Sequence, residues 1–87
     1  MHINDKLDLI GSQLVNRVEE LKKVKTKNND KSINEILAVA LHYCTIIVTM
    51  KELSKKINLS LYKNEIIQQI KLIDEFIEIT EDIKVAA

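Results

Sequence analysis

His42 and Cys44 are the side chains of this chain that could supply a base and a nucleophile. A cysteine acts as a nucleophile when a neighbouring imidazole lies within hydrogen-bond reach and takes its proton. The two residues are two positions apart in a run with a helical pattern, and a helix turns by about 100° per residue. Their side chains therefore point about 200° apart, which excludes a cysteine–histidine pair.

The remaining candidates for chemistry also favour structural roles. A lone cysteine in an apolar run behaves as a small hydrophobic residue and forms no internal disulfide, which is what we expect of Cys44. His42 lies at the edge of the apolar sector, and we expect it to be a half-buried helix histidine. Tyr43 and Tyr62 adjoin apolar positions and could line a small pocket between subunits.

Acidic residues gather near the end of the chain. Asp74, Glu78 and Asp82 recur every four residues and would share one helix face, but no histidine or cysteine joins them at a metal-ligand spacing. Gly11 is the one glycine, so no glycine-rich phosphate-binding loop is present. The sequence predicts no metal site, no cofactor and no enzymatic activity.

The charges are balanced overall but separated along the chain. Lysines cluster in residues 22–31, "KKVKTKNNDK", whereas the 13 basic and 13 acidic residues give no net charge that would attract nucleic acid. One arginine and 3% aromatic residues also fit poorly with base or phosphate recognition. Acids in the last helical turns oppose the helix dipole, so we predict a docking face for a basic partner, formed by Asp74, Glu78 and Glu81; a solubilising face is the alternative. Whether this face or the lysine-rich turn is the functional surface stays open.

The elements that carry these residues are predicted to be helices. The chain is 46% hydrophobic, with no proline and one glycine, which argues against an all-β fold. We predict helices over residues 5–24, 33–57 and 60–83. Apolar residues at spacings of three and four define the first helix: Leu7, Ile10, Leu14, Val18 and Leu21. Gly11 interrupts this helix, and close approach of a neighbouring backbone would explain it.

Helix caps set the expected boundaries. Asn4 or Asp5 can begin the first helix, and Asn58 or Ser60 the third. Ser32 and Glu35 fit a capping box for the second. The short connections favour antiparallel neighbours, so residues 1–87 are expected to form a single all-α domain, an up-down-up three-helix bundle. The first and third helices then end at the same pole, which places the lysine-rich turn beside the acidic tail.

The middle helix contains "EILAVALHYCTIIVTM", residues 35–50, with no charged residue between Glu35 and Lys51. It is apolar on nearly every side, which is typical of a central buried helix. Its uncharged run of fifteen residues spans about 22 Å, which is short for a membrane about 30 Å thick, so we expect no membrane insertion. Two neighbouring helices cannot cover it all. We therefore predict self-association through this helix, as a dimer or larger assembly, with three leftover apolar residues at the contact: Leu41, Ile46 and Val48. A monomer in which the first and third helices wrap closely around the middle one is the alternative.

These inferences favour a small helical interaction protein, a regulator, inhibitor or adaptor that binds another protein. An oligomer that binds or sequesters a small ligand such as a nucleotide is the alternative, and a nucleic-acid-binding regulator is the third possibility. Acidic residues in the first ten positions and no following apolar run argue against a secretory signal, so we expect a cytoplasmic protein. The heavy use of Ile, Lys and Asn is typical of AT-rich coding sequence, as in a low-GC bacterium or a phage.

Overall fold

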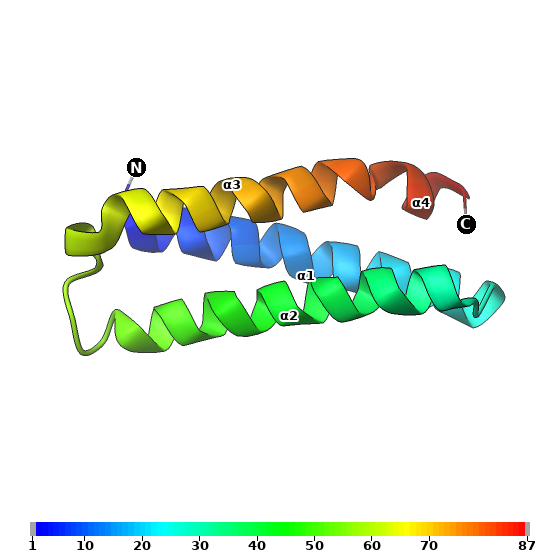
Figure 1. Ribbon diagram of the computed structural model, residues 1–87, viewed down its shortest axis with the longest axis horizontal. Helices are drawn as coiled ribbons and strands as arrows, with labels where there is room; N and C mark the ends of the chain where they lie inside the picture. The colour runs from blue at the N-terminus through cyan, green and yellow to red at the C-terminus, as the bar shows by residue number, and fades with distance from the viewer. Residues whose placement is uncertain (1, 87) are drawn as a thin grey trace.

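The computed structural model describes residues 2–86, with side chains for residues 2–83. Four α-helices and one 3₁₀-helix follow in chain order: α1 (Ile3–Lys27), α2 (Lys31–Leu53), η1 (Leu59–Tyr62), α3 (Lys63–Ile79) and α4 (Glu81–Ala86). The three long helices α1, α2 and α3 run alternately up and down along a body measuring 43 × 19 × 16 Å (Figure 1). The predicted all-α bundle of three packed helices is confirmed.

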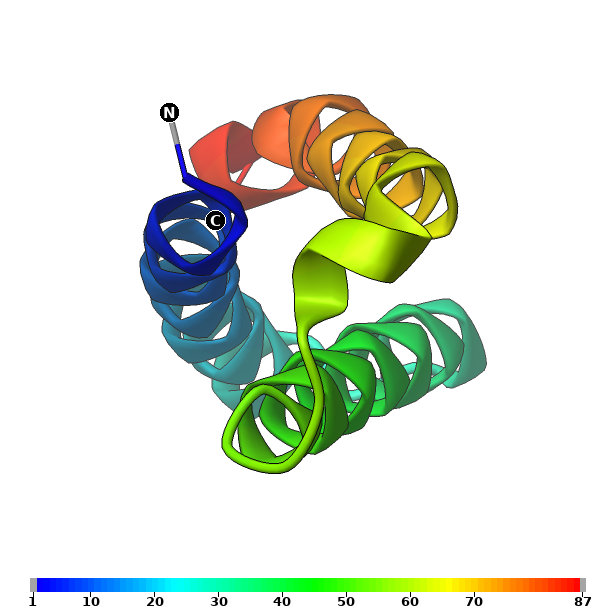
Figure 2. The ribbon, with the colours of Figure 1, turned by 90° about the vertical axis from the view of Figure 1, so that its left-hand side faces the viewer.

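Helix α1 is the central element. It packs against both α2 and α3, whereas the ribbons of α2 and α3 lie apart on the side away from α1 (Figures 1 and 2). Leu7, Leu14 and Leu21, seven residues apart on α1, are fully buried. The expectation that the middle helix would be the central buried one is therefore wrong. Hydropathy alone suggested α2, but the helix with two packed neighbours is the amphipathic α1.

The core has two adjoining parts. The larger part joins the apolar stripe of α1 to Leu37, Ala40 and Ile47 of α2 and to Ile73 of α3. The smaller part closes the end near η1, where Leu59 packs with Leu7 and with Ile3, at the start of α1. Leu59 thus gives the short η1 segment an apolar anchor, which holds the connection between α2 and α3 against α1.

The first two helices begin earlier than predicted. The ring of His2 caps α1, since its Nδ1 accepts a hydrogen bond from the amide of Asn4 at 3.1 Å. Asp30 caps α2, and its carboxylate accepts from the amide of Ile33 at 2.9 Å. The predicted cap roles of Asn4 or Asp5 and of Ser32 are wrong, because an earlier polar side chain already satisfies the free amides of each first turn.

The other predicted bounds also shift. α1 runs on to Lys27, past the expected end at residue 24, and α2 ends at Leu53 instead of residue 57. Asn58, one of the two expected caps, accepts from the amide of Ser60 at 3.0 Å and begins η1. The predicted third helix, residues 60–83, is split into η1, α3 and α4, with the second break at Thr80.

The break at Thr80 has a local cause. The Thr80 hydroxyl donates to the carbonyl of Phe76 at 2.8 Å, and the side chain of Arg17 donates to the carbonyl of Ile77. In an uninterrupted α-helix the Ile77 carbonyl would accept from the amide of Glu81. Because α1 supplies another donor there, the last turn can bend, and α4 packs against α1. Ile83 of α4 then lies in one hollow with Val24, Lys27 and Asn28, so α4 lies beside the end of α1, as expected of helices that end at the same pole.

Candidate functional surfaces

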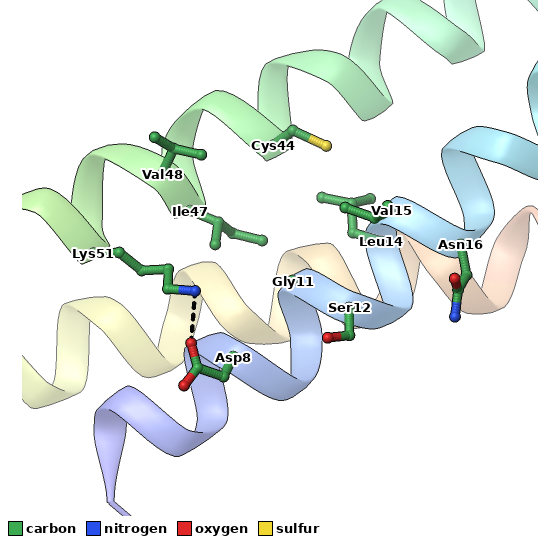
Figure 3. A pocket seen from close by; sticks show the side chains of 10 residues that line it. All are labelled: Asp8, Gly11, Ser12, Leu14, Val15, Asn16, Cys44, Ile47, Val48 and Lys51. Carbon is green, nitrogen blue, oxygen red and sulfur yellow. Dashed lines mark ion pairs between the residues drawn. The ribbon is translucent and has the colours of Figure 1, made fainter.

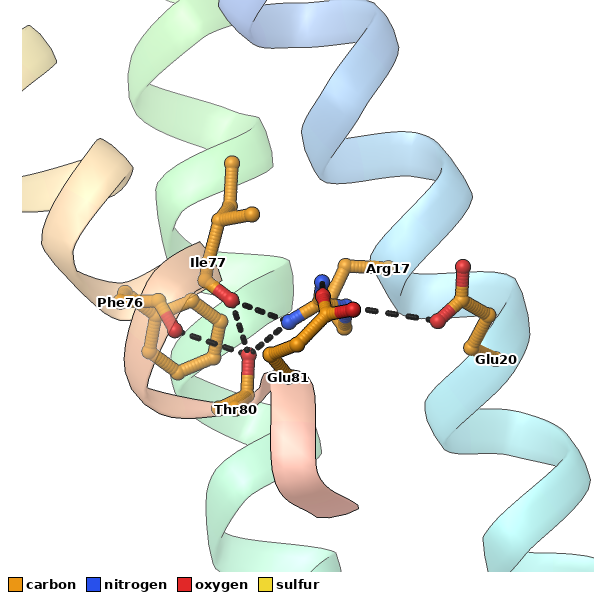
Figure 4. A network of polar contacts seen from close by, with 6 residues as sticks. All are labelled: Arg17, Glu20, Phe76, Ile77, Thr80 and Glu81. Carbon is orange, nitrogen blue, oxygen red and sulfur yellow. Dashed lines mark hydrogen bonds and ion pairs between the residues drawn. The ribbon is translucent and has the colours of Figure 1, made fainter. Parts of the chain in front are cut away.

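Arg17 forms the most elaborate polar cluster among the described residues (Figure 4). Its side chain is 5% exposed and lies on the apolar stripe of α1. The guanidinium donates to the Ile77 carbonyl, to the Thr80 hydroxyl at 2.6 Å and to the Glu81 carboxylate. It thereby connects the middle of α1 to the junction between α3 and α4.

Two carboxylates compensate the buried charge of Arg17. Glu81 is hydrogen-bonded to one end of the guanidinium, and a carboxylate oxygen of Glu20 lies 3.5 Å from Nε. A buried cation is tolerated only when it is paired and hydrogen-bonded. The one arginine of the chain therefore serves to hold the fold together at this point.

Arg17 and Thr80 were not among the residues predicted from the sequence to be functional. A signal for Arg17 exists, because it lies three residues after Leu14 and four before Leu21, on the same apolar stripe. A polar residue at such a position must find partners in the core. No local pattern indicates that Thr80, 63 residues away, supplies one of them.

The structure brings the predicted docking residues together. Asp74, Glu78 and Glu81 line one hollow between α1 and α3, which Arg17 and Glu20 also reach. The carboxylate of Glu81 is engaged by Arg17, whereas Asp74 and Glu78 are exposed. This surface, Asp74 with Glu78 beside the Arg17 cluster, is called the acidic hollow below. Within residues 2–83, no group of three or more His, Cys, Asp or Glu side chains is arranged to hold a metal ion.

A second hollow, of about 390 Å³, lies between α1 and α2 (Figure 3). Gly11 and Ile47 lie at its centre, and Val15, Cys44 and Val48 add apolar surface. An ion pair of 2.6 Å between Lys51 and Asp8 lies at one end (Figure 3). Burial raises the pKa of the Cys44 thiol, and the charge of Lys22 opposes this in part. The thiol is therefore protonated near neutral pH and is a poor nucleophile.

The histidine, cysteine and tyrosines considered in the sequence lie in different settings. His42 is exposed on α2, and Cys44 is half-buried against α1 in the hollow just described. Tyr43 turns toward α3, where its ring meets the ring of Phe76 edge-on at 5.5 Å. Tyr62 is half exposed at the end of η1. The expected half-burial of His42 is wrong, because no neighbouring helix reaches that side of α2.

The three residues predicted for self-association lie on two different flanks of α2. Leu41 and Val48, seven residues apart, share a flank beside the hollow that faces α1, and they are 46% and 59% exposed. Ile46 is half-buried on the other flank, next to Tyr43. At about 100° per residue, Ile46 points about 140–160° away from Leu41 and Val48. One flat interface cannot use all three.

Helix α2 has the length and composition of a membrane-spanning helix, and within residues 2–86 it is the one helix that does. Core helices of soluble proteins meet the same standard, but their apolar residues are mostly buried. In the apolar 18-residue stretch of α2, 22% is buried. The other helices of this chain therefore leave much of the apolar surface of α2 uncovered.

Comparisons of the chain with models of protein families, with curated proteins and with solved structures find no match. The class of the protein is thus set by its own fold: an all-α bundle of three packed helices around α1.

Proposed function

We propose that this chain is a non-enzymatic interaction protein that associates with itself and binds a second protein. The observation that carries the proposal is the uncovered apolar surface of α2, where Val39, Leu41, Val48 and Leu53 are all between 42% and 59% exposed. These exposed apolar residues recur along two flanks of α2, and apolar surface of this extent on a small domain marks an interface. A chain of 87 residues gains core by associating, because its own fold buries a modest share of its surface.

The acidic hollow supports binding to a partner with basic side chains. Asp74 and Glu78 stand one turn apart on the face of α3 beside α1, and both are exposed. The engaged Glu81 and the buried Arg17 fix the backbone beneath them. Carboxylates held on a rigid helix contribute orientation and a faster encounter with a basic partner. A regulator, inhibitor or adaptor would use such a surface to cover part of its target.

A tagged pull-down with mass spectrometry tests the proposed partner. The informative variant is Asp74→Asn with Glu78→Gln, which removes two charges from the acidic hollow. Glu19→Gln with Glu52→Gln is the matched control, since it removes two exposed charges that lie outside the acidic hollow. We expect the first variant to lose a protein that the wild type and the control retain. Equal capture by all three forms would contradict the proposal for this surface.

The hollow between α1 and α2 favours one alternative, the binding of a small ligand. It offers apolar walls and the Lys51 and Asp8 charges at one end. A thermal-shift panel of nucleotides and metabolites tests this function. A rise of several degrees with one compound, abolished by Val15→Trp, would place ligand binding ahead of protein binding.

A further inference from the structure

Helix α2 carries two apolar stripes instead of one. The first stripe faces α1 and comprises Ile33, Leu37, Ala40, Cys44 and Ile47. The second comprises Ile36, Val39, Tyr43, Ile46, Met50 and Leu53. The second stripe alternates spacings of three and four without a break, which is the repeat that packs one helix against another. The structure gives α1 as the partner of the first stripe, and α3 reaches only one edge of the second.

Helix α3 repeats this arrangement. Its first stripe, with Ile66 and Ile73, is buried in the core. Its second stripe comprises Leu72, Phe76 and Ile79, again at spacings of four and three. Tyr43 and Phe76 meet at 5.5 Å, so the second stripes of the two helices lie side by side. Figure 2 shows that α2 and α3 are separated on this side, away from α1.

The outer members of both second stripes remain exposed. Val39 and Leu53 on α2 are each 42% exposed, and Leu72 and Ile79 on α3 are 48% and 74% exposed. Ile46 lies between Val39 and Leu53, seven residues from each, and is half-buried. These five residues define what we call the twin-stripe face.

We propose that the twin-stripe face binds the same face of a second copy, so that α2 and α3 of both copies form a four-helix core. This inference rests on the self-association in the proposed function and specifies which flank of α2 carries it. Two such faces can meet around a two-fold axis that runs along the helices or across them. In both arrangements every neighbouring pair of helices is antiparallel, as in four-helix bundles. Because both helices present the same heptad spacing, the face is complementary to itself under two-fold symmetry.

Area and charge both favour a second copy as the occupant. The broad side of the molecule measures 43 × 19 Å, so it has room for the roughly 800 Å² that each partner contributes to a stable interface of standard size. The α2 stripe has no charged residue between Glu35 and Lys51, and its charges lie at the two ends. The α2 half of the face thus has the uncharged centre and charged ends that are typical of an interface core.

The opposite flank of α2 lacks these features. Val48 stands beside Ser12 and the Lys51–Asp8 ion pair, which interrupt the apolar surface. α1 contributes a single exposed valine there, Val15, instead of a second stripe. Leu41 and Val48 are therefore suited to be controls for the twin-stripe face.

Sedimentation velocity at tens of micromolar tests the inference with matched glutamate variants. Val39→Glu and Leu72→Glu place a charge in the twin-stripe face at positions that are exposed in a single copy, so the helices still fold. Leu41→Glu and Val48→Glu place the same charge on the opposite flank at similar exposure. We expect a dimeric wild type, at least tenfold weaker association in the first pair, and unchanged association in the second. Circular dichroism confirms that all variants are helical.

Other outcomes overturn the inference in distinguishable ways. If the wild type is a dimer and the Leu41 and Val48 variants dissociate it, the assigned face is overturned and self-association is left intact. The same holds if both pairs of variants weaken the dimer, or if neither pair does. A monomeric wild type overturns the face together with self-association, while the pull-down on the acidic hollow decides the rest of the proposed function separately. Flotation of the wild type with phospholipid vesicles, lost in Val39→Glu, would show that a membrane and not a second copy covers this face.

Discussion

The guanidinium of Arg17 donates a hydrogen bond of 2.6 Å to the hydroxyl of Thr80, 63 residues further along the chain. Both side chains are at least 95% buried. The contact occurs where α3 ends and α4 begins, so one side chain from the central helix determines how the last helices are held. Removing such a buried bond lowers the stability of the fold, because a buried polar group that loses its partner keeps the full cost of desolvation.

Replacing Thr80 by valine keeps the side-chain shape and removes the hydroxyl. Arg17 then loses one buried acceptor, and we expect the free energy of unfolding to fall by about 1–3 kcal/mol. Urea denaturation measures the change. Thr45→Val is the control, because the exposed Thr45 hydroxyl bonds only to the Leu41 carbonyl of its own helix, and an effect within about 0.5 kcal/mol is expected there. Equal losses in the two variants would contradict a special role for Thr80.

The start of α2 gives a second prediction. Asp30→Ala removes the cap that accepts from the Ile33 amide, and it should lower the free energy of unfolding by about 1 kcal/mol. Ser32→Ala removes the residue that the sequence pattern favoured as the cap, and it should cost less than half as much. Thermal unfolding followed by circular dichroism compares the two variants. A larger loss of stability in Ser32→Ala than in Asp30→Ala would support the capping box, which the structure contradicts.

Local periodicity predicted the helices well because it depends on neighbours one turn away. Leu7, Leu14 and Leu21 fall on one stripe wherever that helix packs, so the identity of α1 could be read from the sequence alone. The central place of α1 in the bundle could not be predicted from the sequence. That depends on which helix has two packed neighbours, and α2 is the more apolar of the two candidates.

The surfaces were predicted only in part for the same reason. Asp74 and Glu78 share a face by their spacing alone, so the acidic hollow could be anticipated. Leu41 and Ile46 could be assigned to different sides of α2, but the side that α1 covers follows from tertiary packing. The Arg17–Thr80 contact joins distant parts of the chain, and no pattern in a single sequence encodes such a pairing.

Gly11 offers a stabilising substitution. A Cβ added to Gly11 would lie 3.5 Å from Cγ2 of Ile47, an ordinary van der Waals contact with a side chain and not a close approach of backbone. The packing explanation expected for this glycine is therefore wrong. Gly11→Ala should raise the free energy of unfolding by about 0.5–1 kcal/mol, because alanine loses less backbone entropy in a helix. The melting temperature should rise by about 2–8 °C. A fall in melting temperature would show that the hollow between α1 and α2 needs the open space.

Cys44 gives the last two predictions, and the first concerns the reactivity of its thiol. Burial raises the pKa of its thiol, so at pH 8 the folded protein holds less thiolate than an unfolded chain does. Iodoacetamide should therefore modify Cys44 several-fold more slowly in the native protein than in urea, as mass spectrometry over time would show. Equal rates in the two states would contradict the protected setting of the thiol between α1 and α2.

The same shift makes stability depend on pH in a defined direction. In the unfolded chain the thiol loses its proton near pH 8.5, while in the folded protein it keeps the proton to higher pH. Above about pH 8.5 the unfolded state thus binds fewer protons than the folded state, so the free energy of unfolding falls as pH rises. Below that pH the contribution is fully present and constant. Urea denaturation from pH 7 to pH 10 should show a steeper decline in the wild type than in Cys44→Ala, because the variant lacks the thiol. A parallel decline in the two proteins would mean that solvent reaches the Cys44 sulfur freely.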